Sequence, residues 1–102
     1  MFTIFGFYKF QKINNLKKNQ KILNNLLVNK NIYGSIIVSE EGLNGSISGK
    51  NKDIKATIIK LKKIFSIKEF DSFNNSKSKF KPFHKSKVKI KKEVVPMDLK
   101  IS

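Results

Sequence analysis

The segment from residue 77 to residue 92 interleaves basic and aromatic side chains. It reads KSKFKPFHKSKVKIKK, with lysines at nearly every second position and with Phe83 and His84 among them. Lysine ammonium groups neutralise phosphates, and aromatic rings stack on unpaired bases, so the combination is typical of proteins that bind single strands or RNA loops. We expect phosphate contacts from Lys79, Lys81, Lys85, Lys87, Lys89 and Lys91, and base stacking from Phe83 or His84.

The same segment has a structural interpretation. A row of lysines on an edge strand keeps two sheets from pairing edge to edge, and Phe80 and Phe83 would then pack in the core. His84 fits a surface loop better than a general base, because no carboxylate lies within a few residues to orient its ring.

The charge of the whole chain favours a polyanionic partner. All 22 basic residues are lysine, arginine is absent, and only 7 acids oppose them, which gives a net charge of +15. A field of this sign acts over a Debye length of about 8 to 10 Å. Nucleic acid is the first expected partner, and an acidic membrane surface is the second.

Composition excludes several kinds of chemistry. The chain has no cysteine and one histidine, which removes disulfides, thiol nucleophiles, iron–sulfur clusters and any metal site built from several histidines. We therefore predict no metal and no catalytic residue. No apolar run is long enough to cross a bilayer, and the first residues lack the pattern of a signal peptide, so we expect a cytoplasmic protein without a membrane partner.

A second motif is the acidic turn Glu40–Gly45, which glycines bracket. Glu41 and Asn44 could meet a ligand or another domain. Alternatively, Gly42 and Gly45 supply unusual backbone angles and Asn44 caps the turn.

Apolar spacing predicts the elements that position these motifs. The first half of the chain is predicted to form a central strand at Phe2–Phe10, a helix from Gln11 to about Asn29 capped by Asn14 or Asn15, and strands at Ile32–Ser39 and Leu43–Ser48. A second helix starts near Asn51 or Asp53. It is followed by a strand at Ile67–Phe73, a loop at Asn74–Lys81 and a half-exposed strand over residues 87–95. This order predicts an α+β fold, a ferredoxin-like, acylphosphatase-like βαββαβ sandwich with an extra C-terminal strand. We expect one domain over residues 1–97 and the start of a linker at 98–102.

Two functions known on this topology fit poorly. Acylphosphatases bind phosphate with an arginine after the first strand, and Lys9 and Lys12 cannot offer its two-pronged geometry. RNA-recognition motifs need exposed aromatic residues on both central strands. The first strand carries Phe5, Phe7 and Tyr8, but the strand with Asn44, Ser46 and Ile47 carries none.

Several motifs together resemble one family. They are FYKF at 7–10, YGSIIVSEEGLNGSISG at 33–49, Pro82-Phe83 and KVKIKKEVV at 87–95. Over residues 5–97 the chain resembles the N-terminal domain of the rhodanese-domain tRNA hydroxylases, bacterial enzymes that make 5-hydroxyuridine at the wobble uridine with molecular oxygen. The signature residues of the resemblance are Tyr8, Lys9, Glu41, Gly42, Asn44 and Gly45.

The resemblance implies an accessory domain. The reactive cysteine of the family belongs to a rhodanese domain, which these 102 residues do not include, so no catalytic residue carries over. The implied partners are the anticodon region of tRNA and a rhodanese domain in cis or in trans. Molecular oxygen would be a co-substrate of the parent enzyme, with no cofactor in this domain. The alternative is a scaffold that docks on the rhodanese half through the turn from Glu41 to Gly45 and does not touch RNA.

Overall fold

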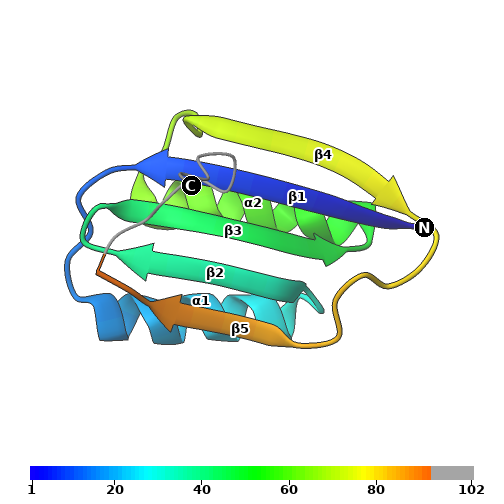
Figure 1. The fold of residues 1–102 in the computed structure, drawn as a ribbon, viewed down its shortest axis with the longest axis horizontal. Helices are drawn as coiled ribbons and strands as arrows, with labels where there is room; N and C mark the ends of the chain where they lie inside the picture. Colours follow the sequence, from blue (N-terminus) through cyan, green and yellow to red (C-terminus); the bar gives the residue numbers. More distant parts are fainter. Residues whose placement is uncertain (93–102) are drawn as a thin grey trace, which may run out of the picture.

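The computed structural model describes residues 1–92 as a five-stranded sheet with two helices on one face (Figure 1). The elements are β1 (Phe2–Phe10), α1 (Leu16–Asn29), β2 (Tyr33–Ser39), β3 (Gly42–Gly49), α2 (Asn51–Phe65), β4 (Ser72–Ser78) and β5 (Ser86–Ile90). The strand order is β4-β1-β3-β2-β5. The predicted ferredoxin-like sandwich with an extra strand is confirmed, and β1 is a central strand.

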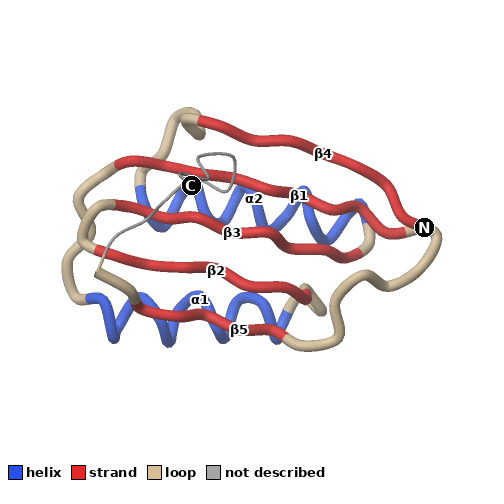
Figure 2. The backbone as a smooth tube through the Cα atoms, in the orientation of Figure 1, coloured by secondary structure: helices blue, strands red, loops and turns tan. Residues whose placement is uncertain are grey.

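All strand pairs are antiparallel except β2 with β5, which is parallel. Both helices lie behind the sheet in the view of Figure 2, so the face toward the reader carries no helix of the described residues. We call this face the helix-free face. Side chains alternate along each strand, and every strand therefore sends half of its residues toward it.

The core lies between the sheet and the helices. Phe5 and Phe7 of β1 are buried there, and Leu23 and Leu27 of α1 are fully buried against the sheet. The apolar positions of α2 recur at helical spacing and face the same core, with Ile54, Leu61 and Phe65 buried. This periodicity is the reason that α2 begins at its predicted position, and β1 has its predicted bounds because its apolar run is continuous.

Two helices cover four of the five strands. α1 packs on β2 and β5, and α2 packs on β1 and β3. A helix is about 10 Å wide with its side chains, whereas neighbouring strands lie about 4.8 Å apart, so one helix covers about two strands. The edge strand β4 is left without a helix over it among the described residues.

The predicted start of α1 is wrong by about five residues. The segment 11–15 forms a loop because its backbone is bonded to the β2–β3 turn, with Gln11 N–H donating to the Glu41 carbonyl at 3.0 Å and Ile13 N–H to the Glu40 carbonyl at 3.2 Å. Asn15 occupies the N-cap position with φ 51°, and its side chain makes no capping hydrogen bond.

The predicted strand at Ile67–Phe73 and loop at Asn74–Lys81 are also wrong. Strand β4 covers Ser72–Ser78, where the sequence is polar. It is an edge strand exposed on nearly every residue, so neither face imposes an apolar pattern. The apolar residues that suggested a strand, Ile67 and Phe70, are buried in the connection between α2 and β4. Three predictions concern the end of the chain. The last strand was predicted to extend to residue 95, the domain to end at residue 97, and a linker to begin over residues 98–102. Residues 93–102 lie outside the described residues, so these bounds stay predictions.

Candidate nucleic-acid interface

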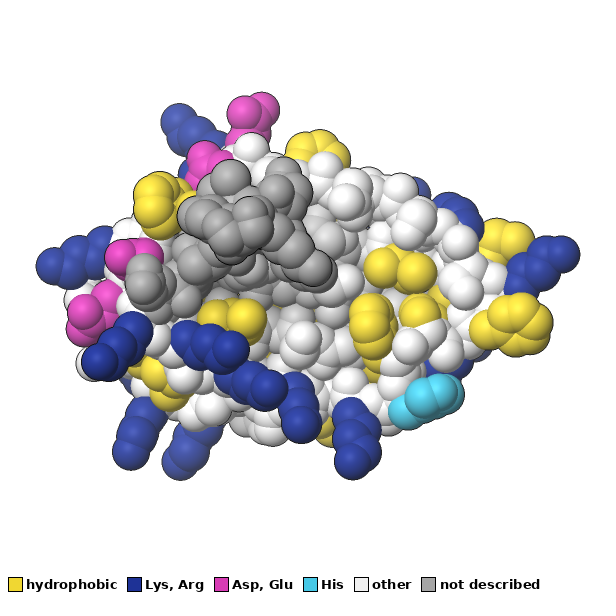
Figure 3. Space-filling view, in the orientation of Figure 1, with side chains coloured by type: hydrophobic (Ala, Val, Ile, Leu, Met, Phe, Trp, Pro, Cys, Tyr) yellow, Lys and Arg dark blue, Asp and Glu magenta, His cyan; other side chains and the backbone are white. Residues whose placement is uncertain are grey.

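Strand β5 presents a row of lysines to solvent on the helix-free face. Val88 points to the core opposite Ile36 and is 9% exposed, whereas Lys87 and Lys89 pair with Ser35 and Ile37 and point the other way. The Lys91 N–H still bonds to the Val38 carbonyl at 2.9 Å, which continues the row by one residue. Successive side chains on one face lie about 6.6 Å apart, given the rise of a parallel strand. Figure 3 shows lysines gathered along this edge of the molecule.

The loop from Lys79 to Lys85 carries the other predicted residues and crosses one end of the sheet to join β4 to β5 (Figure 1). Lys79, His84 and Lys85 are exposed, and Phe83 is half-buried. Phe80, which the structural interpretation placed in the core, is 80% exposed. The loop ends in a fixed position, because Gly34 N–H donates to the Lys85 carbonyl at 2.8 Å.

A pocket of about 440 Å³ lies where this loop passes the start of α2. We call it the end pocket. Its lining residues are Phe2, Asn31, Tyr33, Gly49, Lys50, Lys52, Asp53 and Lys81. The Lys81 ammonium lies 3.6 Å from the centroid of the Tyr33 ring, a cation–π contact. Three lysines and the positive end of the α2 dipole face one carboxylate, so the pocket favours an anion.

Sequence reasoning missed the contribution of Lys50, Lys52 and Tyr33 to this basic surface. A signal was available in the predicted topology, because the third strand, the start of the second helix and the last connection all meet at one end of the sheet. Lys77, which is not among the predicted phosphate contacts, has an ammonium group that donates to Thr3 Oγ1 at 2.9 Å and to Asn51 Oδ1 at 3.3 Å.

The aromatic residues of β1 divide between the two faces of the sheet. Phe5 and Phe7 are buried under the helices and cannot stack on bases. Tyr8 lies on the helix-free face opposite Asn44, with its ring 5.6 Å from that of Phe10. The β3 positions on that face are Gly42, Asn44, Ser46 and Ser48, which carry no aromatic ring. The arrangement needed for an RNA-recognition motif is therefore missing.

The signature residues meet at the other end of the sheet. Tyr8 pairs with Asn44, and Phe10 pairs with Gly42. Gly42 has φ +149°, and a Cβ there would collide with the Lys9 carbonyl oxygen. A Cβ on Gly45 would lie 2.7 Å from the Phe7 ring. Both glycines thus have a structural reason in this fold.

Acidic residues surround this second end. The Lys9 ammonium lies 3.9 Å from Asp71 Oδ2, and the same oxygen accepts a 2.6 Å hydrogen bond from the Phe10 N–H. Burial raises the pKa of Tyr8, and the negative charges of Asp71 and Glu41 raise it further. We call this region, with Glu40, Glu41, Glu69 and Asp71, the acidic end; Figure 3 shows the carboxylates at one end of the view.

Two searches of the described residues concern metal ligands and membrane-spanning helices. Within residues 1–92 no three histidine, cysteine or acidic side chains come together as metal ligands would. None of the helices in the same range is long and apolar enough to span a bilayer.

Sequence comparison gives matches over nearly the whole chain. The model of a family described as the UPF0176 acylphosphatase like domain matches residues 2–94. A tRNA uridine(34) hydroxylase of Pelagibacter ubique is 62% identical over 102 residues, which are 100% of this chain and 34% of that protein. The enzyme of the same name from Ehrlichia ruminantium is 33% identical over 100 residues, 92% of this chain and 34% of its own length. The chain thus spans about a third of these curated relatives.

Solved structures support the fold. Acylphosphatase from Bacillus subtilis superimposes with a TM-score of 0.58 at 9% identity, covering 88% of this chain and 98% of the other. A bacterial light-regulated adenylyl cyclase gives a TM-score of 0.61 at 12% identity, over 100% of this chain and 29% of that one. At such low identity these matches indicate a shared architecture and nothing about activity.

Proposed function

The chain belongs to the family of UPF0176 acylphosphatase-like domains, which form the N-terminal domain of the tRNA uridine(34) hydroxylases. We propose that this domain is the part of such an enzyme that binds tRNA. The observation that carries the proposal is the lysine row of β5, Lys87, Lys89 and Lys91, with no carboxylate of the described residues paired to it. The row leads toward the end pocket through Lys85 and Lys81.

The expected mode of binding follows from the kinds of side chain on this surface. Lysines neutralise phosphates without reading the bases, so the domain would hold the tRNA backbone near the anticodon. Phe83, His84 and the exposed Phe80 could stack on unpaired loop bases. We assign no catalytic residue to the domain. Hydroxylation with molecular oxygen, and the rhodanese domain expected to perform it, belong to the remainder of the enzyme.

Titration of the isotopically labelled chain with an anticodon stem-loop at physiological salt tests the proposal. We expect saturable amide shifts in residues 79–91. Reversal of the β5 row (K87E, K89E, K91E) should reduce the slope of log K against log salt by about 2 to 3, at about 0.7 to 0.9 per lost phosphate contact.

A matched control separates local contacts from net charge. The variant K55E, K60E, K63E changes the charge by the same amount on exposed positions of α2. If both variants weaken binding equally, the β5 row is only part of a general field and the proposal is wrong.

The acidic end supports a second candidate, the scaffold that docks without RNA contact. The carboxylates of Glu40, Glu41, Glu69 and Asp71 weaken the attraction of this end for a phosphate backbone. An N44A variant that abolishes activity of the whole enzyme while leaving tRNA affinity unchanged would favour docking through the turn, and loss of tRNA affinity alone would reject it.

A further inference from the structure

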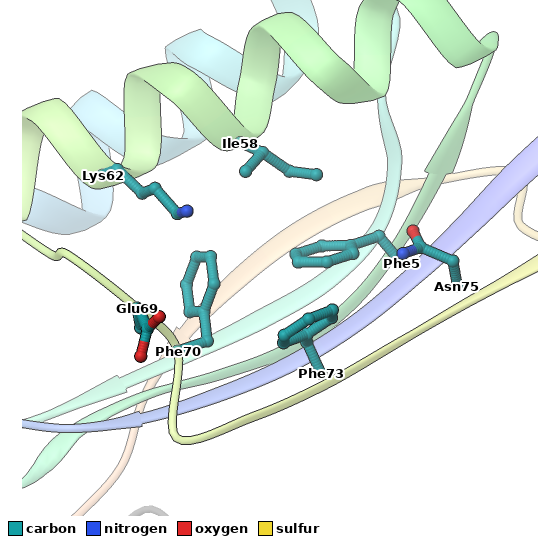
Figure 4. Close-up of a pocket in the computed structure, with 7 residues that line it drawn as sticks. All are labelled: Phe5, Ile58, Lys62, Glu69, Phe70, Phe73 and Asn75. Carbon is teal, nitrogen blue, oxygen red and sulfur yellow. The ribbon is translucent and has the colours of Figure 1, made fainter.

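A pocket of about 370 Å³ opens between α2 and β4 on the helix side of the sheet, away from the lysine row (Figure 4). We call it the α2–β4 pocket. Its lining residues are Phe5, Ile58, Lys62, Glu69, Phe70, Phe73 and Asn75. They come from three elements and from the connection between α2 and β4.

The pocket exists because β4 has no helix over it. Phe73 pairs with Phe7 and therefore points to the helix side of the sheet. Phe7 lies under the helices and is 4% exposed, whereas Phe73 is 61% exposed. A large apolar side chain on the core face of a sheet is normally covered by a packed layer. Over β4 this layer is absent among the described residues.

The walls of the pocket are already ordered. The Phe5 and Phe70 rings are buried and meet edge to face with centroids 5.6 Å apart, and the Phe73 ring lies 6.2 Å from Phe5. Figure 4 shows the three rings around one space, with Ile58 on the α2 side. A preformed apolar pocket binds a side chain with little additional ordering cost.

The charge around the pocket suits a protein segment better than RNA. One lysine and one glutamate stand at its edge, with the Lys62 ammonium 5.8 Å from the Phe70 centroid. Asp71 follows in the same connection, and no lysine occurs from Glu69 until Lys77. A phosphate backbone would gain no net attraction here, whereas an uncharged side chain would be accepted.

We propose that the α2–β4 pocket receives an apolar side chain, aromatic or long aliphatic, from the remaining two-thirds of the longer polypeptide of which this domain is the N-terminal part. The length of the relatives supports this occupant, since this chain accounts for 34% of the Pelagibacter ubique protein. The inserted side chain would complete the apolar layer that α2 leaves unfinished over β4. The inference does not depend on tRNA binding by the lysine row.

Side-chain footprinting tests the inference in a full-length chain. A chimera carries this domain in place of the first third of the Pelagibacter ubique relative, and hydroxyl-radical oxidation of each phenylalanine is measured by mass spectrometry without RNA. We expect Phe73 to be oxidised about fivefold more slowly in the chimera than in the isolated domain. Phe80, which is 80% exposed on a loop outside the pocket, should react equally in both.

Two neighbouring asparagines provide a matched pair of variants. Asn75 lines the pocket, and Asn74 pairs with Gly6 and points to the helix-free face. In the chimera, N75E should expel the occupant and return Phe73 to the rate of the isolated domain, whereas N74E should leave Phe73 protected.

Equal oxidation of Phe73 in chimera and isolated domain overturns the inference, and so does protection that N75E leaves intact. Protection of Phe73 in the isolated domain by an added anticodon stem-loop would instead assign the pocket to a base. Because the decisive comparison contains no RNA, failure of tRNA binding and failure of docking are separate results.

Discussion

The two ends of the sheet differ in construction, and the carboxylates Glu40, Glu41, Glu69 and Asp71 gather at one of them, where Lys9, Lys12 and Lys91 also lie. At one end the connection from β4 to β5 passes the start of α2, and the Lys81 side chain there makes a cation–π contact with Tyr33. At the acidic end, backbone and carboxylate hydrogen bonds fasten the turn Glu40–Gly45 and Asp71 to β1 and the residues after it. The acidic end therefore has the more extensive backbone connections, and the exposed lysines of the basic end suit the contact with a polyanion that we propose.

The largest effect, a loss of stability, should come from a substitution that disrupts the backbone at the acidic end. The variant G42A adds a Cβ at φ +149° that collides with the Lys9 carbonyl, so we expect the free energy of unfolding to fall by about 3 kcal/mol. Chemical denaturation followed by circular dichroism measures it. The control G6A should cost less than about 1 kcal/mol, because its Cβ would meet only the Asn74 side chain, at 3.0 Å. Equal losses would contradict the structural role of Gly42.

A smaller effect is expected from breaking the basic end. Reversing the end-pocket lysines (K50E, K52E, K81E) should weaken binding of an anticodon stem-loop by about tenfold at physiological salt while leaving the fold intact. A charge change at the acidic end, E69Q with D71N, should alter affinity less than about twofold, because the connection before β4 lies at the sheet edge opposite β5, beyond a Debye length of about 8 Å. Fluorescence anisotropy measures both. A larger effect of the second change would place the RNA at the wrong end.

The smallest effect concerns the Tyr8 hydroxyl at the acidic end. Its pKa is raised above 10.0 by burial and then by Asp71 and Glu41, so its neutral form is favoured in the folded protein. This stabilisation is complete below the unfolded pKa and is lost as pH rises through the folded value. In a Y33F background, ultraviolet titration should report only Tyr8, and D71N should lower its pKa. An unchanged titration would show that Asp71 does not act on Tyr8.

Local sequence patterns predicted the elements that bury either one face or both faces in the core. β1 was predicted correctly because its run of apolar residues is continuous, and α2 because Ile54, Leu61 and Phe65 recur on one helix face. β4 was not predicted, since an edge strand exposed on both faces needs no apolar residue. The first residues expected in α1 are a loop because the β2–β3 turn, which lies beyond the whole of α1 and β2 in the chain, takes their N–H groups.

The candidate site was also predictable only in part. The alternation of lysine with Val88 and Ile90 is a local pattern, and it suffices to predict that Lys87 and Lys89 share one exposed face of a strand. The end pocket was missed because its lysines come from the start of α2 and from the β4–β5 loop, two segments that only the closed sheet brings together.

The sequence by itself determined the net charge, the absence of thiol chemistry, the topology and the row of lysines on its last described strand, because composition and periodicity are local properties. Tertiary structure alone decided where the carboxylates gather and which aromatic rings are covered. Phe7 and Phe73 have the same chemistry and pair across two strands, yet one is buried and the other is exposed. The reason is geometric, because one helix covers only about two strands and the two helices pack on the other four strands. The sequence of β4 itself contains no pattern from which this could be predicted.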